Sequence, residues 1–152
     1  MTDERINVQF AIERVYVKDL SFESPRALAV FQQNWQPKVD VQLNTSATKV
    51  DDQRFEVVLR VTVEAKIVDD VAVIVELEQA GLFRVEGPSG PALDQVLAVT
   101  CPNVLFPYAR ETVDSMMVRG TMPPFSLAPV NFELLYAKAM EQKTASGGDE
   151  LN

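Results

Sequence analysis

The stretch FEVVLRVTVEAKIVDDVAVIVELEQAG, residues 55–81, decides the fold of this chain. From Phe55 to Ile67, apolar residues alternate with mostly polar ones. In a β-strand, a period of two places the apolar residues on one face and the polar residues on the opposite, solvent-exposed face. The polar break at Asp69-Asp70 is typical of a tight turn, after which the alternation resumes. The stretch therefore predicts a β-hairpin whose two strands share a buried face.

The other face of this hairpin is unusual, because Val58 and Ile74 lie there among carboxylates. One interpretation is a sheet surface that touches a partner protein. The other is a solvated face with stray aliphatic residues, since single exposed apolar side chains are common on monomeric proteins. The pattern alone does not choose between the two.

Length and charge limit the class of protein. A chain of 152 residues, 47% of them hydrophobic, is long enough to bury a core as one domain. The formal net charge of −8 argues against binding nucleic acid or anionic lipid, because both require a positive field. The charge instead favours solubility and a basic partner.

The chain contains no histidine and one cysteine. This composition excludes Ser-His-Asp and Cys-His catalysis, histidine metal sites, structural zinc sites and an internal disulfide. The first residues show no basic-plus-apolar signal, and no apolar run reaches the roughly 18 residues that a membrane span needs. We therefore expect a soluble, cytoplasmic protein without direct membrane insertion.

Two further strands are predicted before the hairpin, over residues 8–18 and 39–50. The apolar phase of the first strand slips beside Glu13-Arg14, which predicts a β-bulge. Three successive strands with short turns form a meander, and the first strand can return beside the last one to give a Greek-key order.

The connection over residues 19–38 is long and irregular, with a possible helical turn from Pro25. A loop of about 20 residues is rare inside a small domain and is often functional. This one carries Phe22, Phe31 and Trp35. These aromatic side chains either pack beneath the loop or line a groove.

The C-terminal part predicts two helices. Helical spacing runs from Leu93 to Met116, with an interruption expected at Pro102 and a stop at Arg119-Gly120. Asn131 is a suitable N-cap for a short amphipathic helix over residues 132–140. We expect flexible ends over residues 1–7 and 144–152. The fold class is thus α+β, a four-stranded antiparallel sheet with two C-terminal helices.

Few side chains here could carry catalysis. Paired carboxylates occur at Asp51-Asp52, Asp69-Asp70 and Glu76/Glu78, but turns lack the burial that shifts carboxyl pKa values. Cys101 is expected to be a buried thiol rather than a nucleophile. Two hypotheses remain: a protein-binding chaperone or adaptor with apolar grooves and an acidic docking surface, or a small enzyme that uses carboxylates.

Several long segments, in this order, resemble the SecB export chaperone family: VYVKDLSFESP (15–25), FQQNWQP (31–37), FEVVLRVTVEA (55–65), CPNVLFPYAR (101–110) and LAPVNFELL (127–135). The similarity extends from about Phe10 to Met140, whereas GPSGPALDQVLAV (87–99) is less typical. The resemblance implies a cytoplasmic homotetramer, a dimer of dimers, that holds unfolded precursor polypeptides and passes them to the SecA motor ATPase. It implies a crossover loop after strand one, no catalytic residue, no metal and no cofactor.

The resemblance also assigns surfaces. The client-binding groove would be formed by aromatic and aliphatic residues of the crossover loop, the second strand and the last helix: Phe22, Phe31, Trp35, Val39, Val41, Leu43, Phe132, Leu135 and Met140. The SecA-docking surface would comprise Asp19, Glu23, Ile74 and Glu76. The oligomer interface would involve Val75, Leu77, Val104, Tyr108, Thr112 and Met116.

Overall fold

The computed structural model describes residues 8–149 of the chain. In order, the elements are β1 (Gln9–Glu23), the 3-10 turn η1 (Ala29–Gln32), β2 (Lys38–Lys49), β3 (Arg54–Ile67), β4 (Asp70–Glu86), α1 (Pro91–Gln95), the π-turn η2 (Val96–Thr100), α2 (Cys101–Arg119) and α3 (Phe132–Asp149).

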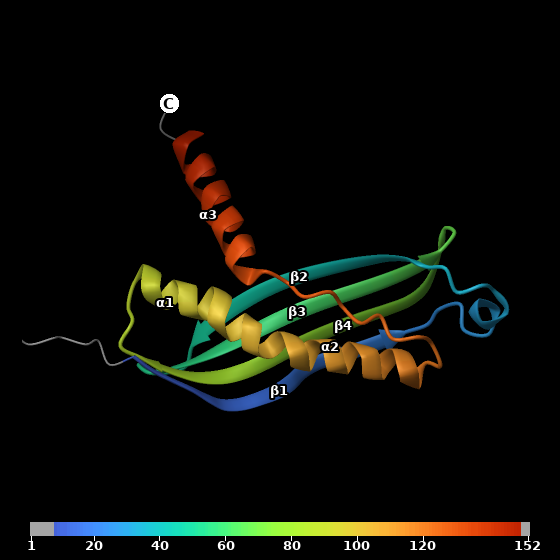
Figure 1. The fold of residues 1–152 in the computed structure, drawn as a ribbon, viewed down its shortest axis with the longest axis horizontal. Coiled ribbons are helices and arrows are strands. Elements are labelled where there is room, and N and C mark those ends of the chain that lie inside the picture. The colour runs from blue at the N-terminus through green and yellow to red at the C-terminus, as the bar shows by residue number, and fades with distance from the viewer. Residues whose placement is uncertain (1–7, 150–152) are drawn as a thin grey trace, which may run out of the picture.

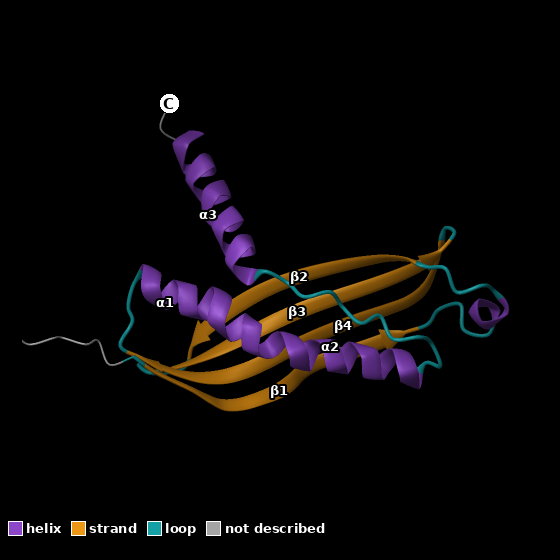
Figure 2. Ribbon diagram, in the orientation of Figure 1, coloured by secondary structure: helices purple, strands orange, loops and turns teal. Residues whose placement is uncertain are grey.

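The strands form one antiparallel sheet in the order β1-β4-β3-β2 (Figure 2). Tight turns join β2 to β3 and β3 to β4, while β1 pairs with β4 along its whole length. The predicted α+β fold with Greek-key strand order is therefore confirmed. The segment over residues 24–37 carries the chain from one edge of the sheet to the other.

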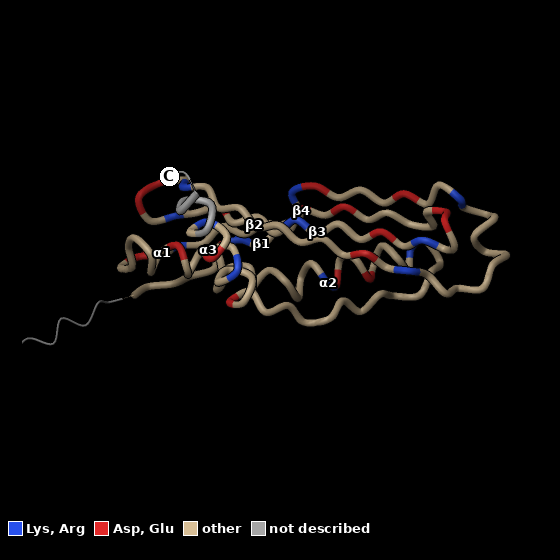
Figure 3. Tube along the Cα trace, turned by 90° about the horizontal axis from the view of Figure 1, so that it is seen from above, with Lys and Arg blue, Asp and Glu red and all other residues tan. Residues whose placement is uncertain are grey.

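The molecule has two layers. The helical rod of α1, η2 and α2 lies across one face of the sheet, which we call the helix face (Figure 1). Figure 3, seen at right angles, shows that no helix of the described chain covers the opposite face, which we call the open face.

The predicted alternation decides which side chains enter the core. Five successive odd-numbered residues of β3, from Val57 to Ala65, are fully buried on the helix face, as are Val75 and Leu77 of β4. From the helix, Leu105 and Val113 close the core against them. Burying one such aliphatic side chain contributes about 1.5–3 kcal/mol, so the shared apolar face is the main source of stability.

The pairing of β1 with β4 is interrupted by two shifts of register. The register shifts between Ile12 and Arg14, where the bulge was predicted, and again between Val17 and Asp19. β1 also continues to Glu23 and β4 to Glu86, further than the alternation suggested, because each pairs with the other over this length.

The prediction that Pro102 interrupts the helix is wrong. α1, η2 and α2 follow one another without a loop. In the π-turn directly before Pro102, the Cys101 N–H donates to the Val96 carbonyl, five residues back. This wider turn accommodates the proline ring and its missing N–H, and the helix continues through both Pro102 and Pro107. It ends at Arg119 with Gly120 as the cap, as expected.

Helix α3 begins as predicted, since the Leu134 N–H donates to the Asn131 side-chain oxygen at 3.0 Å. The helix then continues to Asp149, well beyond the expected residues 132–140 and into the expected tail. It projects away from the β2 side of the body (Figure 1). Residues 1–7 and 150–152, also expected to be flexible, lie outside the described residues.

We predict that Gly81→Ala destabilises the fold by about 1–3 kcal/mol, because it overpacks a closed part of the core. A Cβ at Gly81 would lie 2.5 Å from Cε2 of Phe83 and 3.0 Å from Cδ2 of Leu105, both fully buried. Chemical denaturation measures the loss. Gly90→Ala provides the contrast, because space there is open but φ is +59°, so only backbone strain is added. Unchanged stability of Gly81→Ala would contradict the packing.

Candidate functional site

The first candidate pocket lies where the crossover connection meets the segment after α2. Phe31 and Trp35 line a cavity of about 170 Å³ together with Thr121, Met122 and Pro123. Val30 is buried and anchors the connection, whereas Phe31 is 53% exposed. An aromatic ring held at the mouth of a cavity offers an apolar surface to a ligand.

An uncovered apolar row runs along β2 from this pocket. Val39, Val41 and Leu43 pair with inward-facing residues of β3, so they lie on the helix face. The helical rod covers β3 but leaves the β2 edge free: Val39 and Val41 are 40% and 41% exposed, whereas their β3 partners are fully buried. We call these three residues the β2 row.

The β2 row ends at two further cavities beside α3. Leu43, Phe132 and Leu135 line one of about 300 Å³, and Met140 lines a neighbouring one of about 390 Å³. The two share Thr45, Ala98 and Tyr136, which were not among the predicted groove residues. Tyr136 could have been found from the apolar stripe of its helix. Thr45 and Ala98 carry no such signal.

The residues predicted for the groove therefore form two pocket regions joined by the β2 row. Two of them, Phe132 and Phe22, do not offer an exposed apolar surface as expected. Phe132 is only 3% exposed and forms the floor of its pocket. Phe22 lines none of these cavities. Its ring packs over Gly120, where an added Cβ would lie 2.5 Å from Cζ.

The four predicted docking residues come together on the open face. Across the β1–β4 ladder, Glu23 is paired with Ile74, Ser21 with Glu76, and Asp19 with Glu78. Directly paired residues share a face of the sheet, with Cβ atoms about 4.5–5.5 Å apart. Ile74 is half-buried and also faces Glu64 of β3, so an aliphatic side chain lies between two carboxylates.

The same face carries ion pairs that the sequence did not reveal. Nζ of Lys18 lies 2.7 Å from Oε1 of Glu56, and Oε2 of the same carboxylate accepts a hydrogen bond from the Tyr16 hydroxyl. These donors hold the pKa of Glu56 below its usual value, with Lys18 the larger cause. Burial, followed by the bond to Glu56, raises the pKa of Tyr16 to about 12. Arg60 pairs in the same way with Glu78.

The predicted oligomer-interface residues divide into two groups. Val104, Tyr108, Thr112 and Met116 form one partly exposed stripe of α2. Val75 and Leu77, by contrast, are 0% and 1% exposed inside the core of this subunit. They cannot touch a second subunit directly, and this corrects their assignment to a contact surface. The odd phase of β4 that buries them leaves only its even residues on the open face.

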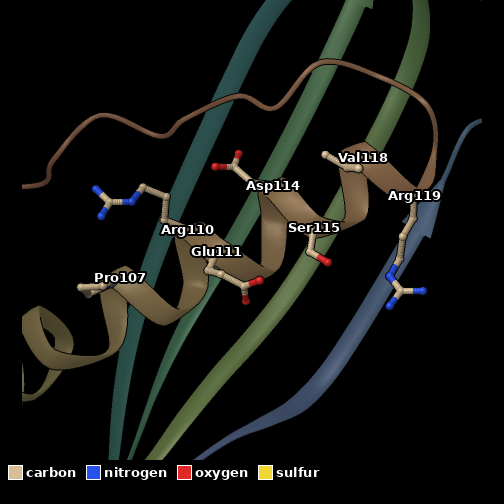
Figure 4. Close-up of a pocket in the computed structure, with 7 residues that line it drawn as sticks. All are labelled: Pro107, Arg110, Glu111, Asp114, Ser115, Val118 and Arg119. Atoms are coloured by element: carbon tan, nitrogen blue, oxygen red, sulfur yellow. The ribbon is translucent and has the colours of Figure 1, made fainter.

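A larger open groove lies along the outer face of α2, which no sequence pattern singled out (Figure 4). It measures about 630 Å³ and is lined by Pro107, Arg110, Glu111, Asp114, Ser115, Val118 and Arg119. The segment after α2 runs past it, and the Ser126 N–H donates to the Asp114 carboxylate at 3.0 Å. Two arginines and two acidic residues line this groove, whereas the β2 row carries no charge.

Cys101 has the environment of a structural thiol. Its side chain is fully buried, and burial raises its pKa to about 12. A thiol in this state remains protonated at neutral pH and is a poor nucleophile. The expectation of a buried thiol is confirmed.

Comparison with known proteins identifies the family. A family model described as "Preprotein translocase subunit SecB" matches residues 3–143. The chain belongs to the SecB family. It is 50% identical over 142 residues to the protein-export protein SecB of Marinobacter nauticus, covering 93% of this chain and 86% of that one. It is 50% identical over 136 residues to SecB of Hahella chejuensis, covering 90% and 86%.

A solved structure agrees with this fold. The SecB-like chaperone of Mycobacterium tuberculosis, in complex with a peptide from the HigA1 antitoxin, superposes with a TM-score of 0.63 at 19% identity. The match covers 80% of this chain and 90% of the mycobacterial one. The family model and the two SecB relatives confirm the expected function, a protein-export chaperone of the SecB family. Within residues 8–149, no helix is long and apolar enough to cross a membrane.

Proposed function

We propose that this protein holds unfolded precursor polypeptides along the β2 row and its flanking pockets, and delivers them to the SecA motor. The observation that carries the proposal is an exposed apolar row between two pocket regions on a negatively charged body. Soluble proteins seldom leave such a contiguous apolar surface uncovered unless it binds something.

The chemistry of the row favours clients that are extended and apolar. Burial of apolar surface yields about 25 cal/mol per Å², reduced by the cost of ordering the captured chain. The side chains of the row are aliphatic and form no hydrogen bonds that could select a particular client sequence. Binding therefore depends on whether the client exposes apolar side chains. Folded proteins bury those side chains and are not bound.

Delivery uses the open face. Carboxylates around Ile74 complement the basic C-terminal tail that is typical of the SecA motor, and such complementarity governs encounter and specificity. The sequence has no glycine-rich phosphate loop, so we assign release of the client to the motor. On this proposal the subunit is not itself an enzyme.

We further propose that the working form is a cytoplasmic homotetramer, a dimer of dimers. The α2 stripe supports this, since Tyr108 is 51% exposed. The edge strand β1 adds Ile12 and Val17, which are 49% and 46% exposed on the helix face. Oγ1 of Thr112 in the stripe lies 3.5 Å from the side-chain oxygen of Gln79, the residue paired with Val17, so the two surfaces adjoin. Size-exclusion chromatography with light scattering tests the assembly, and a monomer at micromolar concentration would refute it.

Holding activity is tested directly by mixing the purified protein with a chemically unfolded precursor and following aggregation by light scattering. The proposal expects suppression of aggregation and a stable complex with the unfolded precursor. It expects no complex with the same precursor once that precursor has folded. Failure to bind the unfolded form would overturn the assignment.

We predict that Trp35→Ala weakens binding of an unfolded client by roughly 5- to 30-fold, because aromatic residues in pockets are frequent hot spots. Trp35 contributes the largest side chain to the pocket that it shares with Phe31. Calorimetric titration measures the affinity, and thermal unfolding shows whether the fold is retained. Trp35→Phe keeps an aromatic ring and serves as the matched control. Unchanged affinity for Trp35→Ala would remove this pocket from the groove.

A further inference from the structure

The carboxylates of the open face divide into two groups. Glu56, Glu64 and Glu78 each hold a cation, which is Lys18, Lys66 and Arg60 respectively. Lys18 is next to Asp19 in the sequence and Arg60 is diagonal to Glu76 across the ladder, and we call their partners Glu56 and Glu78 the clamping carboxylates. Asp19, Glu23 and Glu76 form no ion pair within residues 8–149, and we call these three the docking carboxylates. The division is not by strand, because Glu76 and Glu78 are both on β4.

Lys18 lies on the open face at the second bulge of β1. In the ladder, Val17 pairs with Gln79 and Asp19 with Glu78, so Lys18 is the extra residue between them. Val17 lies on the helix face, so alternation places Lys18 on the open face, where it reaches Glu56, and the bulge places Asp19 on the same face. Without Glu56 as its partner, a flexible lysine adjacent in sequence to Asp19 would be free to neutralise it.

Arg60 neighbours the docking carboxylates across the ladder. It is paired across the β3–β4 ladder with Glu78, and Glu76 is the diagonal neighbour two residues away on β4. Glu78 is the main cause that raises the pKa of Arg60, and the charges of Glu76 and Asp19 add to it. The Arg60 guanidinium is therefore near two docking carboxylates, Asp19 and Glu76, but forms its ion pair with Glu78.

We propose that the clamping carboxylates are positioning residues of the docking surface: they hold Lys18 and Arg60, two cations of the open face, so that the docking carboxylates stay unpaired for a basic partner segment. This rests on the proposed delivery to SecA. A surface that neutralised its own carboxylates would lose the attraction that guides a basic segment to it. The unpaired groups are costly only through mutual repulsion, which is small at an exposed face.

The test is Glu78→Gln, which leaves every docking carboxylate in place. We expect the affinity for the purified SecA motor, measured by calorimetry with the full chain, to fall about three- to fivefold at low salt, as for exposed charge pairs. Arg60→Gln combined with Glu78→Gln should restore the wild-type affinity, because no cation is then released. Above roughly 0.5 M salt, all these variants should converge, since screening shortens to a few ångströms.

Glu13→Gln is the matched control for the lost negative charge. Glu13 also pairs with an arginine, Arg84, but at the other end of β1, eight residues and about 26 Å from Ser21 in the centre of the docking surface. It should leave the affinity unchanged, so a general effect of net charge can be distinguished from local masking. A second pair, Glu56→Gln with and without Lys18→Gln, repeats the design on β1.

Wild-type affinity in Glu78→Gln, or a double variant as weak as Glu78→Gln alone, would overturn the inference. An equal loss in Glu13→Gln would overturn it as well. The docking surface itself is judged separately by Glu76→Lys. If that reversal has no effect, the proposed delivery site is wrong; if it abolishes binding while Glu78→Gln binds normally, only the positioning role is wrong.

Discussion

We expect Glu76→Lys to abolish measurable binding of the SecA motor, a loss of about 100-fold or more, and to leave the holding of unfolded clients unchanged. Glu76 is exposed in the centre of the docking surface, opposite Ser21 and diagonal to Asp19 and Glu23. A lysine there reverses one charge and is also within reach of both neighbouring carboxylates. The substitution therefore removes the attraction of all three docking carboxylates together.

Two titrations measure this effect, one with the SecA motor and one with an unfolded precursor. Asp69→Lys is the matched control, because it makes the same change of charge at an exposed position in the turn before β4. It should bind the motor normally. If Glu76→Lys loses motor and client equally, the division between an open docking face and a helix-face groove is wrong.

The second large effect is expected from Val41→Glu. Val41 is the middle residue of the β2 row, between the pocket of Trp35 and the pocket of Leu135. An unpaired carboxylate resists transfer into an apolar interface, so a client can no longer lie continuously along the row. We expect the affinity for a long unfolded client to fall at least about tenfold, and that for short peptides that fill one pocket to fall less.

Gln42→Glu is the control for this substitution. It adds the same charge to the same edge strand one residue later, but on the open face, since Gln42 pairs with Thr62 and Val41 with the buried Val63. Both variants should unfold at similar temperatures, because both side chains are exposed. Equal client binding by both variants would show that the β2 row is not part of the groove.

The elements that could be predicted from the sequence are those with a local cause. Alternation over residues 55–67 defined β3, a phase slip at Glu13-Arg14 marked the first bulge, and Asn131 and Gly120 marked helix ends. Each depends on backbone geometry within a few residues. Pro102 shows the limit, since the π-turn that accommodates it is a response of the packed helix.

Of the candidate site, the sequence supplied the residue types and the family but not their grouping. Trp35 and Leu135 were expected in one groove, and the structure places them in separate pockets joined by the β2 row. That row is exposed only because the helical rod lies over β3 and leaves the edge strand bare. No property of β2 alone specifies which of its neighbours will be covered.

Taken alone, the sequence determined the strands, the helix caps, the acidic character and membership of the SecB family. Only the tertiary structure decided that Val75 is core rather than interface, and which carboxylates are already occupied. The reason is distance along the chain: Lys18 and Glu56 are 38 residues apart, and their contact depends on the register of β1, β4 and β3. Periodicity is a local property of the backbone, whereas the pairing of charges belongs to the assembled sheet.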